Sequence, residues 1–233
     1  MTDLDPERVA RVTHALAGRE PDPAQSLCAA SAGVVGVAGA GLVLMSGGRA
    51  LGNVCASDRR TATVEDVQYS LGEGPCVDAV RSHAPVLVPD LASPDLERWA
   101  AFRVGALEAG VRAAFGFPLL VRTICIGALD LYHDRTGPLT AEQHADAEAV
   151  AHVATRTLLG WQAVAPTDSV AWQLQQVPVH RAVVHQAAGM VSVQSAVSVD
   201  DALALLRAYA FAEGRSVGPV AADVVAGRLR LEW

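Results

Sequence analysis

The spacing of apolar and polar residues predicts short helices and strands up to about residue 139, and helices alone beyond it. Apolar positions three and four apart predict helices at 6–17 and 23–32. Two strand-like runs follow in GAGLVLMSGGRALGNVCAS, and the Gly47-Gly48 pair between them is a hairpin signal. Three more strands are expected in APVLVPD, VRAAFGFPLLV and ICIGALDLYH, among helical stretches at 58–68, 75–82 and in SPDLERWAAFRVGALEAG. Because there are no regular βαβ units, the pattern predicts an α+β fold with an antiparallel sheet.

The stretch SLGEGPCVDAV, residues 70–80, is predicted to be a turn that leads into a helix. Its glycines permit positive φ angles, and Pro75 suits the first helical position. A phosphate-binding loop is excluded because the third glycine is missing and Glu73 carries a negative charge. Cys76 would lie near the positive end of a helix, but Glu73 and Asp78 oppose activation of its thiol. We therefore expect Cys76 to be a buried apolar side chain. Since no nucleophile–base or metal-ligand constellation is present, we expect no enzymatic activity.

A long helix is predicted to begin after Thr140, where TAEQ forms a capping box with Gln143. Six residues fall on one helical stripe: Ala147, Val150, Ala151, Ala154, Leu158 and Trp161. This stripe either packs on the sheet of its own domain or forms a dimer interface.

The rest of the chain reads as three helices after a linker, VAPTDS. The first helix runs from about residue 170 to 193, and Pro178 is a place where it can bend. Ser198 caps the second helix, which runs to about residue 213. Ser216 caps the third, and Gly227 stops it. The expected organisation is a domain at 1–160 containing the sheet and long helix, a linker or helix at 161–177, and a small helical bundle at 178–233.

Composition and cysteine spacing favour a cytoplasmic location. The apolar runs are well short of the roughly 18 residues of a membrane span. The N-terminus, MTDLDPERVARV, is acidic and polar, whereas a secretory signal begins with basic and then apolar residues. The cysteines Cys28, Cys55, Cys76 and Cys125 form no C-x-x-C pair, so neither a disulfide framework nor a zinc site is expected.

Charge is distributed unevenly along the chain. The formal net charge is −7, and all 18 basic residues are arginine. Residues 1–160 carry 13 Arg against 19 Asp and Glu, whereas residues 178–233 carry five of each. The C-terminal region is therefore the one from which an anionic partner is not repelled.

Two parts of the sequence resemble known domains. The stretch YSLGEGPCVDAVRSHAPVLVPDL, with GVRAAFGFPLLVRTICIGALDLYH, resembles a GAF domain of bacterial regulators over roughly residues 24–160. Residues 170–230 resemble an ANTAR domain, a family that reads roughly R-x-x-I-x-x-A-K-G-x-L-M and then S-x-x-E-A-x-x-L-L-R. The matching positions are Arg181, Ala187, Gly189, Ala202, Leu205, Leu206, Arg207, Arg215, Ala221 and Val225.

The resemblance implies a regulator that binds RNA stem-loops in nascent transcripts, prevents a terminator from forming, and acts as a homodimer. It implies that the protein binds neither DNA nor a membrane. The candidate RNA-binding residues are Arg181, His185, Gln186, Arg207 and Arg215.

The chain departs from the ANTAR family pattern at two places. Ala188 stands where the family has the lysine of A-K-G, in the middle of an expected helical stripe with Arg181, His185 and Ser192. The basic pair before the third helix is reduced to Arg215-Ser216. Each phosphate contact adds an electrostatic contribution to RNA affinity, so the loss of two basic residues should weaken binding. The alternative is a dimeric ligand-sensing or protein-interaction regulator whose degenerate ANTAR domain no longer binds RNA.

The GAF domain is expected to be the input, which binds an unidentified small molecule or a partner, with no bound metal or other cofactor. Its cavity would lie between the sheet and the covering helices. The candidate lining residues are Trp99, Phe102, Phe115, Phe117, Asp130 and Tyr132. Asp130 is predicted in mid-strand, where a buried carboxylate needs a partner. It marks either a hydrogen-bond network or a ligand site.

Overall fold

The computed structural model describes residues 4–17, 22–46, 49–164, 179–215 and 217–231. The chain divides into two compact units, Met1–Val164 and Ala165–Trp233.

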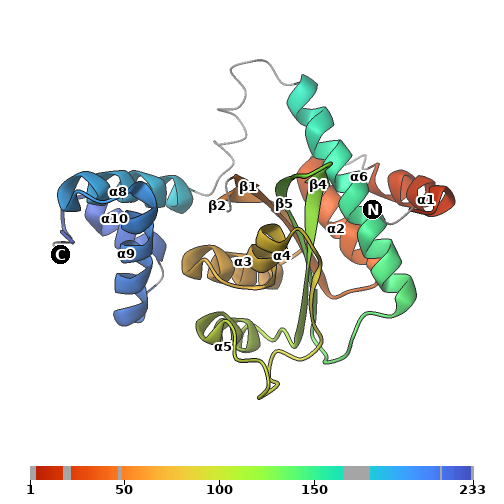
Figure 1. The fold of residues 1–233 in the computed structure, drawn as a ribbon, viewed down its shortest axis with the longest axis horizontal. Helices are drawn as coiled ribbons and strands as arrows, with labels where there is room; N and C mark the ends of the chain where they lie inside the picture. The colour runs from red at the N-terminus through yellow and green to blue at the C-terminus, as the bar shows by residue number, and fades with distance from the viewer. Residues whose placement is uncertain (1–3, 18–21, 47–48, 165–178, 216, 232–233) are drawn as a thin grey trace. The chain divides into compact units, whose positions relative to one another are not determined.

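The larger unit is built on a five-stranded sheet with strand order β2-β1-β5-β4-β3 (Figure 1). All of its neighbouring strands pair antiparallel, as the sequence predicted. The strands are β1 (Gly39–Ser46), β2 (Arg49–Ala56), β3 (Val86–Val88), β4 (Ala113–Val121) and β5 (Ile124–His133). Gly47 and Gly48, the predicted hairpin turn, lie outside the described residues.

One face of the sheet packs against α2 (Pro23–Val35) and α6 (Ala141–Val164), and α1 (Pro6–Leu16) packs on these two helices. The predicted capping box of α6 is present, because the Thr140 and Gln143 side chains each accept a hydrogen bond from the other's backbone N–H. The stripe from Ala147 to Leu158 is buried in the core shared with α1, α2 and the strands. Of the two alternatives for this stripe, packing within its own domain is the one observed.

The other face of the sheet packs against α3 (Arg59–Leu71) and α4 (Pro75–Ser82), and α5 (Ala100–Glu108) packs on α3. The turn predicted between residues 70 and 75 connects α3 to α4. Gly72 and Gly74 have φ angles of 66° and 133°, in the region that favours glycine. Glu73 accepts a hydrogen bond of 2.9 Å from the backbone N–H of Phe102, at the start of α5. The stretch therefore joins three helices, and its acidic residue satisfies a helix N-terminus rather than opposing a bound anion.

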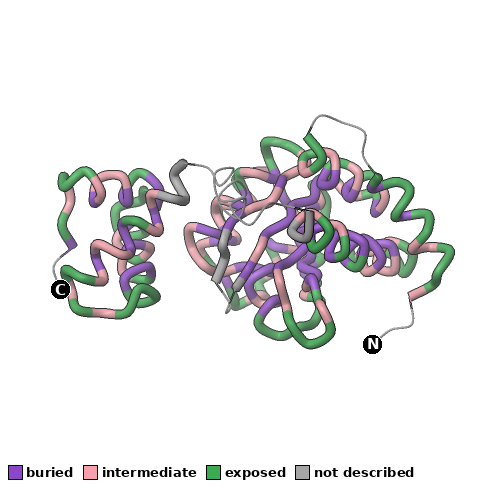
Figure 2. The backbone as a smooth tube through the Cα atoms, turned by 90° about the horizontal axis from the view of Figure 1, so that it is seen from above, coloured by how far each residue is buried: buried purple, intermediate pink, exposed green. Residues whose placement is uncertain are grey.

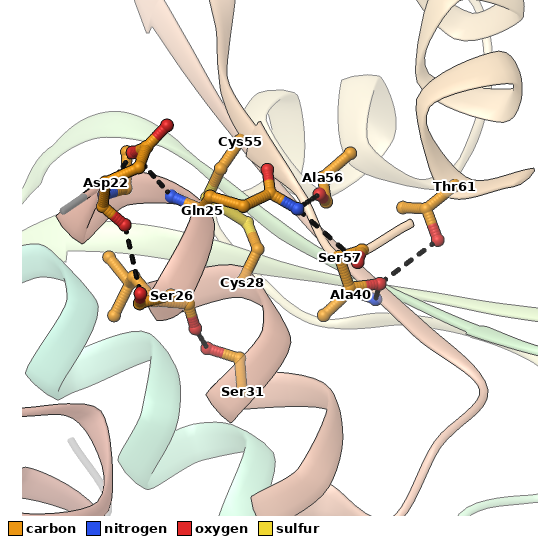
Figure 3. The surroundings of a disulfide bond; sticks show 12 residues. Asp22, Gln25, Ser26, Cys28, Ser31, Ala40, Cys55, Ala56, Ser57 and Thr61 are labelled. Atoms are coloured by element: carbon orange, nitrogen blue, oxygen red, sulfur yellow. Dashed lines mark hydrogen bonds between the residues drawn. A yellow bond between two sulfur atoms is a disulfide. The ribbon is translucent and has the colours of Figure 1, made fainter. Parts of the chain in front are cut away.

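A disulfide joins Cys28 of α2 to Cys55 of β2, which makes the expectation of no disulfide wrong (Figure 3). The two residues are 27 positions apart and their Cα atoms are 5.9 Å apart, so no short motif signals the pair. The hydrogen bond of 2.8 Å from Gln25 Nε2 to the Ala56 carbonyl ties the same two elements together. The disulfide thus fastens α2 to an edge strand of the sheet.

The smaller unit is a bundle of α8 (Val179–Ser195), α9 (Val199–Ala212) and α10 (Val217–Val225). Ser198 caps α9 by accepting a hydrogen bond of 3.1 Å from the Asp201 N–H, and Gly227 follows α10 with a φ of 71°. The predicted cap Ser216 and the predicted helical residues 170–178 lie outside the described residues. Figure 2 shows buried stretches in the smaller unit. Among the described residues, its buried apolar side chains are aliphatic and small: Val184, Ala187, Ala188, Val191, Ala202, Leu203, Leu206, Ala210, Val217, Val220, Ala221, Val224 and Leu231.

Among the described residues, no single helix has the length and apolar character needed to cross a membrane. The segments Val183–Ser195 and Val199–Ala212 reach that length and composition only when joined, and they are bent by 106° at their break.

Candidate functional sites

The aromatic residues expected to line one cavity lie on opposite faces of the sheet. Phe115 and Phe117 belong to the core with α2 and α6. Trp99, Phe102 and Tyr132 belong to the core beside α3 and α5. The sheet separates the two groups, so Phe115 and Phe117 do not share a site with the others.

Asp130 lies on the α3–α4 face of the sheet, at a position where both neighbouring strands carry glycine. It pairs with Gly41 of β1 and with Gly116 of β4. A Cβ atom at Gly41 would lie 2.2 Å from Glu65 Oε1, and one at Gly116 would lie 2.8 Å from the Pro75 carbonyl oxygen. The missing side chains therefore allow Glu65 and the start of α4 to lie directly against the strands beside Asp130.

A chain of hydrogen bonds runs through this site. Gln68 Nε2 donates to Tyr132 Oη over 2.8 Å, and Tyr132 Oη donates to Glu65 Oε1 over 3.0 Å. Gln68 Oε1 accepts from the Cys76 backbone N–H over 3.3 Å. All five side chains of this polar cluster are buried: Glu65, Gln68, Cys76, Asp130 and Tyr132. The structure thus places Asp130 and Tyr132, two of the predicted ligand-pocket residues, in one cluster with three residues that were not predicted as site residues.

Burial determines the protonation of the polar cluster. Desolvation, together with the adjacent Glu65 carboxylate, raises the pKa of Asp130 well above its usual range. Desolvation and the two carboxylates also raise the pKa values of Tyr132 and of the Cys76 thiol. Cys76 is therefore a protonated, buried thiol, the opposite of an activated nucleophile.

Sequence reasoning did not identify Glu65 and Gln68 as site residues. They lie three positions apart on α3, which places them on one face of that helix. Two polar residues at this spacing, next to the apolar Val64, were the one feature of the sequence that could have indicated a buried polar site on α3. Their partners lie more than 60 residues away on β5, so only the folded chain shows what they contact.

The candidate RNA-binding residues of the bundle differ in exposure. Gln186 and Arg215 are exposed, whereas His185 and Arg207 are half-buried. His185 and Arg207 each interact with another residue of the chain. Arg181 lies on α8, but its side chain is outside the described residues.

Ala188 is fully buried, at 0 % exposure, and so does not belong to an outward-facing stripe with His185. The helix turns this position toward α9 and α10, on which α8 packs. The expectation that a lysine is missing from the middle of an exposed basic stripe is therefore wrong for this structure. A lysine at position 188 would first have to displace core atoms or reach around them to solvent.

Asp223 of α10 pairs with two arginines at the surface of the bundle. Its carboxylate pairs with Arg215 over 2.6 Å and with Arg228 over 2.8 Å. These hydrogen bonds, that of Arg215 first, lower the pKa of Asp223. The side chains of Arg215 and Arg228 stay 41 % and 64 % exposed, so each presents further N–H donors to solvent. Two guanidinium groups and one carboxylate leave this arginine pair with one positive charge in excess.

Comparison with known protein families identifies both units. The sequence model of the GAF domain matches residues 22–158, more than half of the chain, and that of the ANTAR domain matches residues 172–225. The chain belongs to the GAF domain family and carries an ANTAR domain after it. The order of the two domains is the one expected from the sequence. GAF and ANTAR domains are typically regulatory, so this GAF–ANTAR chain is a regulator of the ANTAR type.

The solved structures that are similar to this chain have low sequence identity to it. The GAF domain of a phosphoenolpyruvate-protein phosphotransferase from Acinetobacter is 12 % identical, with a TM-score of 0.51 over 68 % of this chain and 94 % of that one. The corresponding domain from Coxiella burnetii is 13 % identical, with a TM-score of 0.49 over 67 % and 94 %. A type II free methionine-R-sulfoxide reductase from Thermoplasma acidophilum is 16 % identical, with a TM-score of 0.39 over 52 % and 79 %. The Acinetobacter structure supports the GAF fold alone. A comparison with curated proteins found no match.

Proposed function

We propose that this GAF–ANTAR regulator binds RNA stem-loops through its C-terminal bundle and acts as a transcription antiterminator under the control of its GAF domain. The observation that carries the proposal is the exposed pair Arg215 and Arg228 on either side of Asp223. A shared carboxylate holds two planar donor groups close together, which suits contact with adjacent phosphate oxygens. The net charge of zero in this domain, against −6 for residues 1–160, supports it as the part that an anionic polymer approaches.

Fluorescence titration of a labelled two-hairpin RNA at several salt concentrations tests RNA binding. If Arg228 contacts a phosphate, Arg228→Ala weakens binding and lowers the slope of log affinity against log salt by about 1. Asp223→Asn removes the negative charge between the arginines, so it should tighten binding most at low salt. Arg156→Ala, an exposed arginine on α6 of the GAF domain, is the matched control and should leave the slope unchanged. A terminator–reporter assay with the same variants then tests antitermination.

A second function has its own support: a dimeric regulator that senses a ligand or binds a protein partner and has lost RNA binding. The bundle carries strongly exposed apolar side chains, Val193 at 84 % and Phe211 at 66 %. Such residues favour contacts with another protein surface. No RNA binding even at low salt, together with a concentration-dependent dimer that Phe211→Ser abolishes, would select this function over the first.

A further inference from the structure

We propose that Cys28 and Cys55 form a reversible redox site, which opens to two thiols by exchange with a small thiol and recloses by exchange with the corresponding disulfide. The proposal rests on the RNA-binding function proposed above, because a protein that acts on nascent transcripts shares its compartment with the thiols that keep cysteines reduced. A disulfide in such a compartment is usually catalytic or redox-sensing. The proposal is carried by the place of this disulfide in the fold and by the loop that it closes.

The disulfide lies at the edge of the sheet. Cys55 is the last residue but one of β2, and β2 stands at one end of the strand order, with β1 as its neighbour on one side. The pairing of β2 with β1 is interrupted by two register shifts. Cys28 is 0 % exposed and Cys55 8 %, so a thiol reaches the Cys55 sulfur when the end of β2 separates from α2. Local opening of this kind costs less at an edge with few partners than in the centre of a core.

The exchange transfers two electrons and two protons from two small thiols to the protein. A thiolate attacks Cys55 Sγ, forms a mixed disulfide with it and displaces Cys28 as a thiolate, which takes up a proton. A second thiolate attacks the mixed disulfide at the sulfur of the small molecule and displaces Cys55, which is protonated in turn. The products are one small-molecule disulfide and two protein thiols. The reverse sequence recloses the site.

The length of the loop sets how readily the site opens. In the unfolded chain, two cysteines 27 positions apart meet at an effective concentration on the order of 1 mM. The folded domain favours the disulfide by the same factor by which the disulfide favours folding, on the order of a hundredfold for such a loop. The effective concentration in the folded protein is then about 0.1 M. Half of the molecules are therefore open when the squared thiol concentration, divided by the disulfide concentration, is about 0.1 M.

Closing the site fixes the start of α3. One residue after Cys55, the Ala56 carbonyl accepts a hydrogen bond of 2.8 Å from Gln25 Nε2 of α2, as Figure 3 shows. Two residues further on, Asp58 caps α3 by accepting a hydrogen bond of 3.0 Å from the Thr61 N–H. The chain thus passes directly from the disulfide into the helix that carries part of the polar cluster. Opening the disulfide removes the covalent part of this clamp, so β2 and α3 should open more often.

The other two cysteines of the chain do not compete for the exchange. Burial raises the pKa of the Cys76 thiol well above its usual range, and it also raises the pKa of the Cys125 thiol. Both thiols therefore stay protonated at neutral pH, and a protonated thiol is a poor nucleophile. Oxidation is thereby confined to the pair formed by Cys28 and Cys55.

Equilibration of the full chain in glutathione buffers tests the proposal. Glutathione is varied from about 1 mM to about 100 mM at about 1 mM glutathione disulfide, and free thiols are then alkylated in acid-quenched, denatured samples and counted by mass. The ratio of closed to open protein should fall about a hundredfold for each tenfold rise in glutathione, with equal amounts at about 10 mM. Cys125→Ser removes a thiol outside the pair and should leave this midpoint unchanged.

Hydrogen exchange of the same samples tests the coupling to α3. Peptides from β2 and α3 should exchange faster in the open form than in the closed form, whereas those from α8, α9 and α10 should not change. Cys28→Ala with Cys55→Ala should reproduce the open form in every buffer. Near-ultraviolet circular dichroism checks that this double variant is folded.

Three results would overturn the proposal. Protein that stays closed at about 100 mM glutathione has a structural disulfide, and protein that stays open at about 1 mM forms no stable disulfide. Equal exchange of α3 in both forms would remove its link to the redox site. Because the experiment contains no RNA, its failure is separate from a failure of RNA binding by the bundle.

Discussion

The two domains differ in how far they bury the ionisable residues of their candidate sites. The GAF domain encloses Glu65 and Asp130 between its sheet and helices, at 2 % and 1 % exposure. The ANTAR domain has a core of aliphatic and small residues and keeps Arg215, Asp223 and Arg228 at its surface. In the first domain charge is costly and protonation is shifted, whereas in the second it is hydrated and weakened by salt.

This difference in burial indicates what kind of partner or signal each domain can respond to. A buried carboxyl pair responds to a single molecule or proton that reaches it, because desolvation makes each such event energetically large. An exposed arginine pair responds to a long anionic surface through several small contributions that add. Mutations should therefore act on stability in the GAF domain and on partner binding in the ANTAR domain.

Removing the disulfide should give the largest effect. Closing a loop of 27 residues stabilises a protein by about 3 kcal/mol through the unfolded chain. Because Cys28 and Cys55 both lie in the GAF domain, Cys28→Ala with Cys55→Ala should destabilise that domain and leave the ANTAR domain unchanged. Hydrogen exchange followed by peptide mass spectrometry separates the two. Equal loss of protection in α8–α10 would show that the domains do not behave independently.

A single added methyl group should distinguish the interiors of the domains. Gly116→Ala places a Cβ 2.8 Å from the Pro75 carbonyl oxygen, so the start of α4 must shift, at a cost of about 2 kcal/mol. Gly189→Ala is the matched control in α8, where a Cβ meets nothing within 4 Å. This second change should stabilise the bundle by about 0.5–1 kcal/mol, as alanine does in a helix. Urea unfolding measures the free energy of unfolding of each variant. The prediction is wrong if neither substitution changes the stability of its domain.

Local patterns were sufficient to predict most elements of the fold. The capping box at Thr140 and Gln143, the Ser198 cap and the turn at Gly72 and Gly74 depend on residues a few positions apart, and the structure contains all three. Such signals are read directly from neighbouring residues.

The site and the disulfide could not be predicted in this way. Asp130 is flanked by glycines only because of the register of three strands, and a shift of one residue would turn it to the other face. The same alternation separates Phe115 and Phe117 from Tyr132. Helical spacing puts Ala188 on one stripe with His185, but the packing of α8 on two other helices determines which positions are buried. Each of these features depends on contacts between distant parts of the chain.

The pH dependence of stability should follow the raised pKa of Asp130 in the GAF domain. The folded state binds more protons than the unfolded state above the ordinary pKa of an aspartate, so stability falls as pH rises toward the folded pKa. The slope reaches at most about 1.4 kcal/mol per pH unit for one such group. Asp130→Asn should remove this part of the slope and make the GAF domain more stable than the parent near neutral pH. Urea unfolding between about pH 5 and about pH 8 checks it, and an unchanged slope in the variant would contradict the assignment.

Asp223 should show the opposite sign and the smallest effect. Its pKa is lowered by hydrogen bonds from Arg215 and Arg228, so its contribution to stability is present above the ordinary aspartate pKa and lost as pH falls through the folded value. Because the pair lies at the surface, solvent and salt screen it, and Asp223→Asn should leave the unfolding midpoint of the bundle unchanged at neutral pH. The same substitution should nevertheless tighten RNA binding, since it changes the charge that an approaching phosphate meets. A large loss of stability without any change in RNA affinity would show that this arginine pair supports the fold rather than a partner.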